Sequence, residues 1–185
     1  GTGSGATGTG HRGDWPTENP PDGLNWTVSP NEVSTGFAWS IRNTGTATAM
    51  TGPSADNSAI GSTYIYTEAS QGDGSGTPKF AQVITPCIDL TNVSCAALEF
   101  YYHMYGADID RIRVDVDTGT ATNKYVTSVA TLIGQKQTSS NQPYEKAFIS
   151  LEQFSGRIIR IRFVGRKNTS VSQDKNDMAI DDITV

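Results

Sequence analysis

Two adjacent carboxylates, Asp181 and Asp182, interrupt the apolar run MAIDDITV at residues 178–185. A pair of carboxylic acids can serve as general acid and base, or it can ligate a metal ion. The run alternates like a β-strand, on which neighbouring side chains point to opposite faces. The two groups could therefore share one substrate only across a β-bulge, which disfavours catalysis. The inward carboxylate needs a compensating partner: a hard cation, an arginine or backbone N–H donors.

His103, in the segment FYYHMYG, is a second residue that could do chemistry, because histidine is the common general base near neutral pH. The only other histidine is His11, and the strings Gly-x-Ser-x-Gly and HExxH do not occur. A packing role at a strand end is therefore favoured over catalysis. The alternative is an aromatic platform for a sugar ring, because Tyr101, His103 and Tyr105 would share one strand face. We expect no enzymatic activity.

Arginines in two strand-like segments carry the strongest binding signal. They alternate with apolar residues in RIRVDVD and RIIRIRFVGRK and are Arg111, Arg113, Arg160 and Arg162. If both strands lie in one sheet, these arginines form a cationic strip that could bind an acidic glycan, because guanidinium groups hold carboxylates and sulfates through paired hydrogen bonds. The alternative, which we favour, is that the arginines pair across strands with Asp115, Asp117 and Glu99.

The chain has two cysteines, Cys87 and Cys95, in the segment PCIDLTNVSC. Two thiols are too few for a four-ligand zinc site, and no Cys-x-x-Cys pair occurs. We expect a disulfide that closes this short loop, which would place the domain outside the cytoplasm. Two free thiols are the alternative.

Strand-like alternation must position all of these residues. It recurs at intervals of roughly ten to twenty residues, and no helix-like period extends beyond about two turns. One face of residues 97–106 carries Leu98, Phe100, Tyr102 and Met104. The remaining segments are 37–43, 62–70, 79–86, 110–119, 157–167 and 178–185, with weaker candidates at 125–133 and 144–151. Because turns rather than crossover helices separate the segments, they predict an all-β fold, an antiparallel two-sheet β-sandwich of the jelly-roll type.

Composition limits the partners. The net charge of −5 disfavours a general nucleic-acid binder, which carries a strongly basic surface. No apolar run approaches the roughly 20 residues needed to cross a bilayer, so we expect no membrane span. Residues 1–13 begin GTGSGATGTG and are expected to form a Gly/Thr-rich spacer, followed by a single domain over 14–185. We expect this domain to be part of a larger protein.

Several segments together resemble a MAM domain, in particular the version found in secreted bacterial proteins. The matching strings occur in the family's order and are GLNW (23–26), FAW (37–39), TGPSAD (51–56), GSTYIYTEAS (61–70), ITPCIDL (84–90), LEFYYHMYG (98–106), IRIRFVG (159–165) and DMAIDDI (177–183). They are spread over nearly all of residues 20–185. The resemblance implies a jelly-roll β-sandwich, a secreted, extracellular location, and a role in adhesion, recognition or assembly.

The resemblance also implies a structural cation, because some MAM-like jelly rolls hold one between the first and last strands. Here Asp56, with Glu18 or Asp22, could join Asp181 or Asp182 around one Ca²⁺ or another hard cation. Oxygen ligands of this kind suit such an ion. Backbone or arginine pairing of the buried carboxylate stays the alternative.

We therefore expect a non-catalytic extracellular module for recognition or adhesion. Its partners would be a protein or polysaccharide surface ligand and the other domains of its parent protein. The alternative is a carbohydrate-binding module, accessory to a secreted polysaccharide-degrading enzyme and suited by its arginines to acidic glycans. A jelly roll is common to both, and the fold alone does not decide between them.

Overall fold

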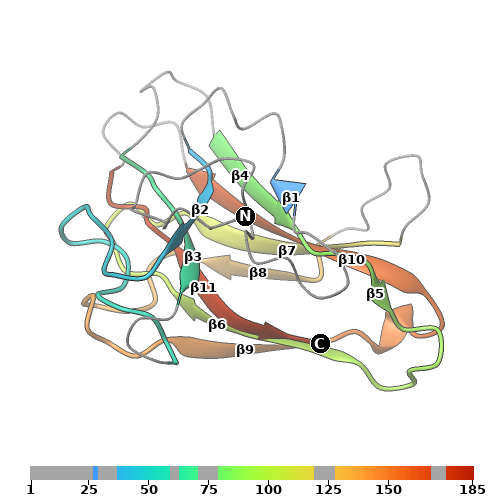
Figure 1. The fold of residues 1–185 in the computed structure, drawn as a ribbon. Helices are drawn as coiled ribbons and strands as arrows, with labels where there is room; N and C mark the ends of the chain where they lie inside the picture. Colours follow the sequence, from blue (N-terminus) through green and yellow to red (C-terminus); the bar gives the residue numbers. More distant parts are fainter. Residues whose placement is uncertain (1–26, 29–36, 59–62, 71–78, 119–127, 168–173) are drawn as a thin grey trace, which may run out of the picture.

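The structure is a computed structural model that describes residues 27–28, 37–58, 63–70, 79–118, 128–167 and 174–185. Within these ranges the chain forms eleven β-strands and one 3-10 helix, η2 (Glu152–Phe154). The strands make two antiparallel sheets that pack face to face (Figure 1), which confirms the predicted all-β sandwich. No helix in the described ranges has the length and apolarity needed to cross a bilayer.

The two sheets are built from strands that are distant in sequence. The first has the order β1, β4, β10, β7, β8, and β5 also pairs with β10. Its strands are β1 (Thr27–Val28), β4 (Lys79–Ile84), β5 (Ile88–Asp89), β7 (Arg111–Asp117), β8 (Ala130–Ile133) and β10 (Ile158–Lys167). The second has the order β2, β3, β11, β6, β9. Its strands are β2 (Trp39–Arg42), β3 (Tyr64–Thr67), β6 (Ala97–His103), β9 (Glu145–Ser150) and β11 (Ala179–Thr184).

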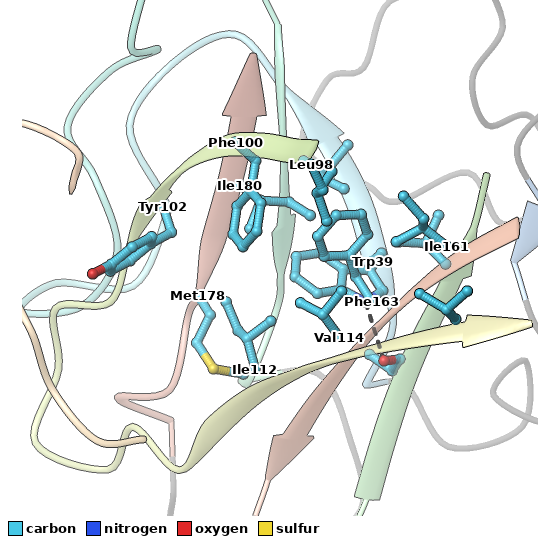
Figure 2. Packing of buried hydrophobic residues seen from close by; sticks show 14 of the residues in the cluster. Trp39, Leu98, Phe100, Tyr102, Ile112, Val114, Ile161, Phe163, Met178 and Ile180 are labelled. Atoms are coloured by element: carbon cyan, nitrogen blue, oxygen red, sulfur yellow. Dashed lines mark hydrogen bonds between the residues drawn. The ribbon is translucent and has the colours of Figure 1, made fainter. Parts of the chain in front are cut away.

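The core lies between the sheets, where the alternating apolar residues point inward (Figure 2). The core-facing residues of β6, β7 and β10 are those that alternation predicts: Leu98, Phe100, Tyr102, Ile112, Val114, Val116, Ile159, Ile161 and Phe163. Phe100 and Phe163 meet edge to face across the sheets, with ring centroids 5.2 Å apart. Trp39 Nε1 donates a hydrogen bond to the carbonyl of Ala81 at 3.0 Å, which ties β2 to β4.

Gly165 marks a close approach of the two sheets. A Cβ atom at this position of β10 would lie 2.9 Å from Thr67 Cγ2 and 3.2 Å from Met178 Cε. Neither distance leaves room for an ordinary van der Waals contact, so a larger residue would have to displace the Thr67 and Met178 side chains. The glycine thus permits the close packing of the two sheets beside Trp39.

A β-bulge interrupts β11 at the adjacent carboxylates. The register with β6 shifts between Asp181 and Thr184, and Asp182 has a φ of 47°. Ile180 and Ile183 both pack against the core although they are three residues apart. The extra residue of the bulge therefore keeps Asp182 out of the core and returns Ile183 to it.

The expected disulfide is not formed. Cys87 and Cys95 are both free thiols, and both are exposed. Arg160 Nε lies 3.3 Å from Cys87 Sγ and donates to it. Hydrogen bonds close the intervening turn instead: Val93 N–H donates to the carbonyl of Leu90 at 3.2 Å, and the Asp89 carboxylate accepts from Thr91. The turn thus needs no covalent closure, and the cysteines carry no argument about cellular location.

Candidate functional site

The outer face of the first sheet carries the predicted arginines. β7 and β10 are neighbours, and their register places Arg162 opposite Asp115. Asp115 is buried and pairs with both flanking arginines, through Oδ1 to Arg113 Nε at 2.9 Å and through Oδ2 to Arg162 Nη2 at 2.5 Å. The strands therefore share a sheet, as the cationic strip requires, and cross-strand pairing is also present.

The other two carboxylates predicted to pair with the arginines, Asp117 and Glu99, lie in different sheets. Arg160 lies opposite Asp117 in the register of β10 and β7. Glu99 pairs instead with Lys146 on the second sheet, at 2.7 Å between Oε2 and Nζ. The expectation that Glu99 serves an arginine of the strip was wrong, because β6 lies in the opposite layer of the sandwich.

We call the outer surface of the first sheet, with Arg111, Arg113, Arg160 and Arg162, the arginine face. Two residues that the sequence analysis missed, Arg166 and Asp110, extend it. Arg166 lies directly opposite Arg111 in the register, and Asp110 bridges the two guanidinium groups. Asp110 Oδ1 is 2.8 Å from Arg111 Nε, and Asp110 Oδ2 is 3.0 Å from Arg166 Nη1. The signal for Arg166 was present, since it continues the alternation of Arg160 and Arg162 along β10.

A hollow of about 370 Å³ opens among these side chains. We call it the arginine hollow, and its lining residues are Phe80, Arg111, Arg113, Thr131, Val164 and Arg166. No carboxylate is among these lining residues, as far as the described part of the chain extends. Val164 is buried at the outer face of β10, and the Arg166 guanidinium lies 5.9 Å from the centre of the Phe80 ring. The hollow thus joins cationic groups to an apolar surface.

The two carboxylates of the bulge meet one loop residue. Asn57 donates its backbone N–H to Asp181 Oδ2 at 3.1 Å and its side-chain Nδ2 to Asp182 Oδ2 at 2.8 Å. Asp181 Oδ1 also accepts the N–H of Asp182 at 2.9 Å. Asp181 is the buried member of the pair and Asp182 the exposed one, and burial raises the pKa of Asp181 to about 6. Backbone N–H donors therefore compensate the buried carboxylate.

The described residues do not make a cation site by themselves. Asp56 lies on the same loop, where its Oδ1 accepts the N–H of Ser58 at 2.9 Å. Among the residues with described positions, no group of three His, Cys, Asp or Glu side chains is arranged to hold a metal ion. Glu18 and Asp22, the two remaining predicted ligands, lie outside the described residues.

The predicted aromatic platform does not assemble, because His103 is completely buried. Its ring packs 5.3 Å from that of Tyr144, and burial lowers the pKa of His103 to about 4. Tyr101 is half-buried beneath Lys146, whose Nζ lies 5.9 Å from the ring centre, and Tyr105 is also half-buried. A neutral, buried imidazole fits the packing role that the sequence favoured.

Comparison with known proteins agrees with this architecture. The MAM domain family, meprin/A5/mu, matches residues 11–185. This chain belongs to the MAM family. The MAM domain is 31% identical over 101 residues to neuropilin-1a of Danio rerio, a match that covers 55% of this chain and 10% of that protein. A MAM domain is a non-catalytic module, and such domains are typically extracellular.

Two solved structures share the fold of this MAM domain. The K1 cleaved adhesin domain of Lys-gingipain from Porphyromonas gingivalis W83 has a TM-score of 0.55 and 17% identity, covering 85% of this chain and 88% of that one. The K2 cleaved adhesin domain of Lys-gingipain has a TM-score of 0.51 and 17% identity, covering 93% and 91%. At this identity the likeness concerns the fold alone.

The MAM domain also contains a buried carboxyl pair that the sequence analysis missed. Asp177 is fully buried, and its Oδ1 accepts the N–H of Ala69 at 2.8 Å, while its Oδ2 accepts no hydrogen bond from the described part of the chain. Burial, assisted by the carboxylate of Glu68, raises the pKa of Asp177 to about 8. In the sequence Asp177 looks like a turn residue before a strand, since nothing local shows that the charge of Glu68 acts on it.

Proposed function

We propose that this MAM domain is an extracellular recognition or adhesion module of a larger secreted protein, which it attaches to a protein or polysaccharide on a surface. The arginine face is the observation that carries the proposal. The side chains of Arg111 and Arg113 are 40% exposed, whereas those of Asp110 and Asp115 are 10% and 3% exposed. An approaching ligand therefore meets guanidinium groups before it meets carboxylates.

The charge of this face opposes that of the whole chain. The four arginines that pair with Asp110 and Asp115 are Arg111, Arg113, Arg162 and Arg166. Four positive and two negative groups leave a formal charge of +2, on a chain whose net charge is −5. A local patch of opposite sign orients a charged ligand toward one face. Recognition through this face should accordingly favour anionic ligands.

A panel of immobilised extracellular proteins and polysaccharides tests the proposal. We expect the purified chain to bind at least one member, with an affinity that falls as NaCl rises from about 0.05 to 0.5 M, because salt screens exposed charges. Binding to none of the panel would contradict a recognition function. An unchanged affinity across the salt series would remove the arginine face from it.

A carbohydrate-binding accessory of a polysaccharide-degrading enzyme is the second candidate function. The arginine hollow favours it, because about 370 Å³ lies within the size range of small-ligand sites. The exposed Phe80 ring at its edge supplies an apolar surface for a sugar. This candidate predicts that polysaccharides bind and that proteins of the panel do not.

We also propose a calcium ion at the loop that carries Asp56, provided that Glu18 or Asp22 completes the ligand set. Support comes from the contact of Asn57 with both Asp181 and Asp182, which gathers carboxylates at this point. EDTA should then lower the melting temperature and added Ca²⁺ should restore it. A melting temperature that neither reagent shifts would exclude the ion.

A further inference from the structure

We propose that the arginine hollow binds an acidic polysaccharide, with a uronate carboxylate or a sulfate ester between its guanidinium groups and a sugar ring against Phe80. This inference rests on the proposed recognition function and names its ligand class. It follows from the sheet register, the ion pairs beneath the hollow and the apolar residues that line it.

The register places two like charges directly opposite each other, at Arg111 and Arg166. Such a pair destabilises a sheet unless something compensates it. Asp110 bridges the two, and among the described ion pairs this single carboxylate balances only one of the two charges. A ligand anion would balance the other. These ion pairs thus leave one positive charge unbalanced, as a site that binds an anion requires.

Within the described part of the chain, both guanidinium groups keep donors for that ligand. The ion pairs with Asp110 use Nε of Arg111 and Nη1 of Arg166, whereas a guanidinium has five N–H donors. Asp115 holds the third arginine of the hollow, Arg113, at both Nε and Nη2, each at 2.9 Å. Because these ion pairs fix the side chains before a ligand arrives, little conformational entropy is lost on binding.

The hollow exists because Val164 is short. It lies opposite Arg113 on β7 and opposite Gln82 on β4, so a small apolar side chain stands between two long ones. Arg111 precedes Arg113 on β7, and Arg166 follows Val164 on β10, each at about 7 Å along its strand, the spacing of residues two apart. An anion above Val164 would therefore have arginines on more than one side.

Apolar residues in the hollow favour a sugar over an acidic peptide. Phe80 lies opposite Arg166 in the register of β4 and β10 and is 42% exposed. An acidic sugar offers a charged substituent for the arginines and a rigid face of C–H groups for the exposed Phe80 ring. Aspartate and glutamate side chains offer only the charge. The combination of groups matches the sugar.

Isothermal titration of four probes tests the inference: a heparin hexasaccharide, a polygalacturonate oligomer, a neutral cello-oligosaccharide and poly-L-glutamate. We expect at least one acidic oligosaccharide to bind and the neutral one to fail. The double variant Arg111→Gln/Arg166→Gln should lose roughly tenfold or more in affinity, since hydrogen bonds to charged groups are the strong ones. Phe80→Ala should lose several-fold.

Two further variants make the result specific. Arg157→Gln removes an exposed arginine outside the hollow and should keep its affinity within about twofold. Thr131→Tyr fills the hollow from an exposed position on β8 without removing any ion pair, and it should abolish binding. This variant decides the question if the double variant fails to fold, as judged by circular dichroism.

Each outcome separates the inference from the proposed function. If poly-L-glutamate binds as tightly as the sugars and Phe80→Ala has no effect, the ligand is an acidic peptide and the inference fails. If an acidic oligosaccharide binds equally to the wild type, the double variant and Thr131→Tyr, the hollow is not the site although recognition stands. If no protein or polysaccharide binds, both are overturned.

Discussion

The carboxyl group of Asp177 makes a sharp prediction about pH. Burial raises its pKa from about 3.8 to about 8, so the folded domain holds a proton that the unfolded chain releases near pH 4. The stability from this group is fully present below pH 4 and is lost as the pH rises to about 8. Since one pH unit corresponds to about 1.4 kcal/mol, the free energy of unfolding should fall by about 2 kcal/mol from pH 6.5 to 8.5.

Asp177→Asn should remove this loss. An asparagine keeps an acceptor for the Ala69 N–H and has no charge to bury. Urea unfolding at intervals from pH 6.5 to 8.5 measures the effect above the folded-state pKa values of His103 and Asp181, about 4 and 6. The His103 imidazole of the unfolded chain titrates near 6.5 and contributes equally to both proteins. Glu152→Gln, which changes an exposed carboxylate, should keep the wild-type slope. A flat wild-type profile, or the same slope in Asp177→Asn, would refute the reasoning.

Three further predictions concern packing and titration. Trp39→Phe should lower the free energy of unfolding, measured in urea, by about 2–4 kcal/mol, because the hydrogen bond to the Ala81 carbonyl and part of the core volume are lost. A change below about 0.5 kcal/mol, the size expected of a surface substitution, would contradict this. Gly165→Ala should cost about 1–3 kcal/mol in the same assay through its clash with Thr67, and an unchanged midpoint would show free space. NMR titration should find His103 neutral until about pH 4, whereas an ordinary midpoint near 6.5 would mean that it is solvated.

The sequence was sufficient to predict a two-sheet sandwich, because strand alternation depends on neighbouring residues alone. Alternation correctly predicted that Leu98, Phe100 and Ile161 point into the core. The arginine hollow was only partly predictable. Phe80 and Arg166 are far apart in the chain and meet because β4 pairs with β10, which no local pattern encodes.

Loops account for two of the predictions that failed, the aromatic platform and the disulfide. Alternation correctly set His103 apart from the core-facing residues of β6, but it could not show that Tyr144 would cover the ring. In the same way, the two free cysteines reflect a turn closed by its own hydrogen bonds around Leu90. Burial by a loop depends on where a distant segment packs, and a strand pattern carries no such information.

Because of the bulge at Asp182, the two adjacent carboxylates have different structural roles. Asp181 anchors the loop at Asn57, while Asp182 takes up the surplus residue in a left-handed conformation that aspartate adopts more readily than most residues. A valine or isoleucine at position 182 would resist that conformation. Asp182 therefore determines which side of the sheet the following residues face. A residue that cannot adopt the left-handed conformation at this position would turn Ile183 away from the core.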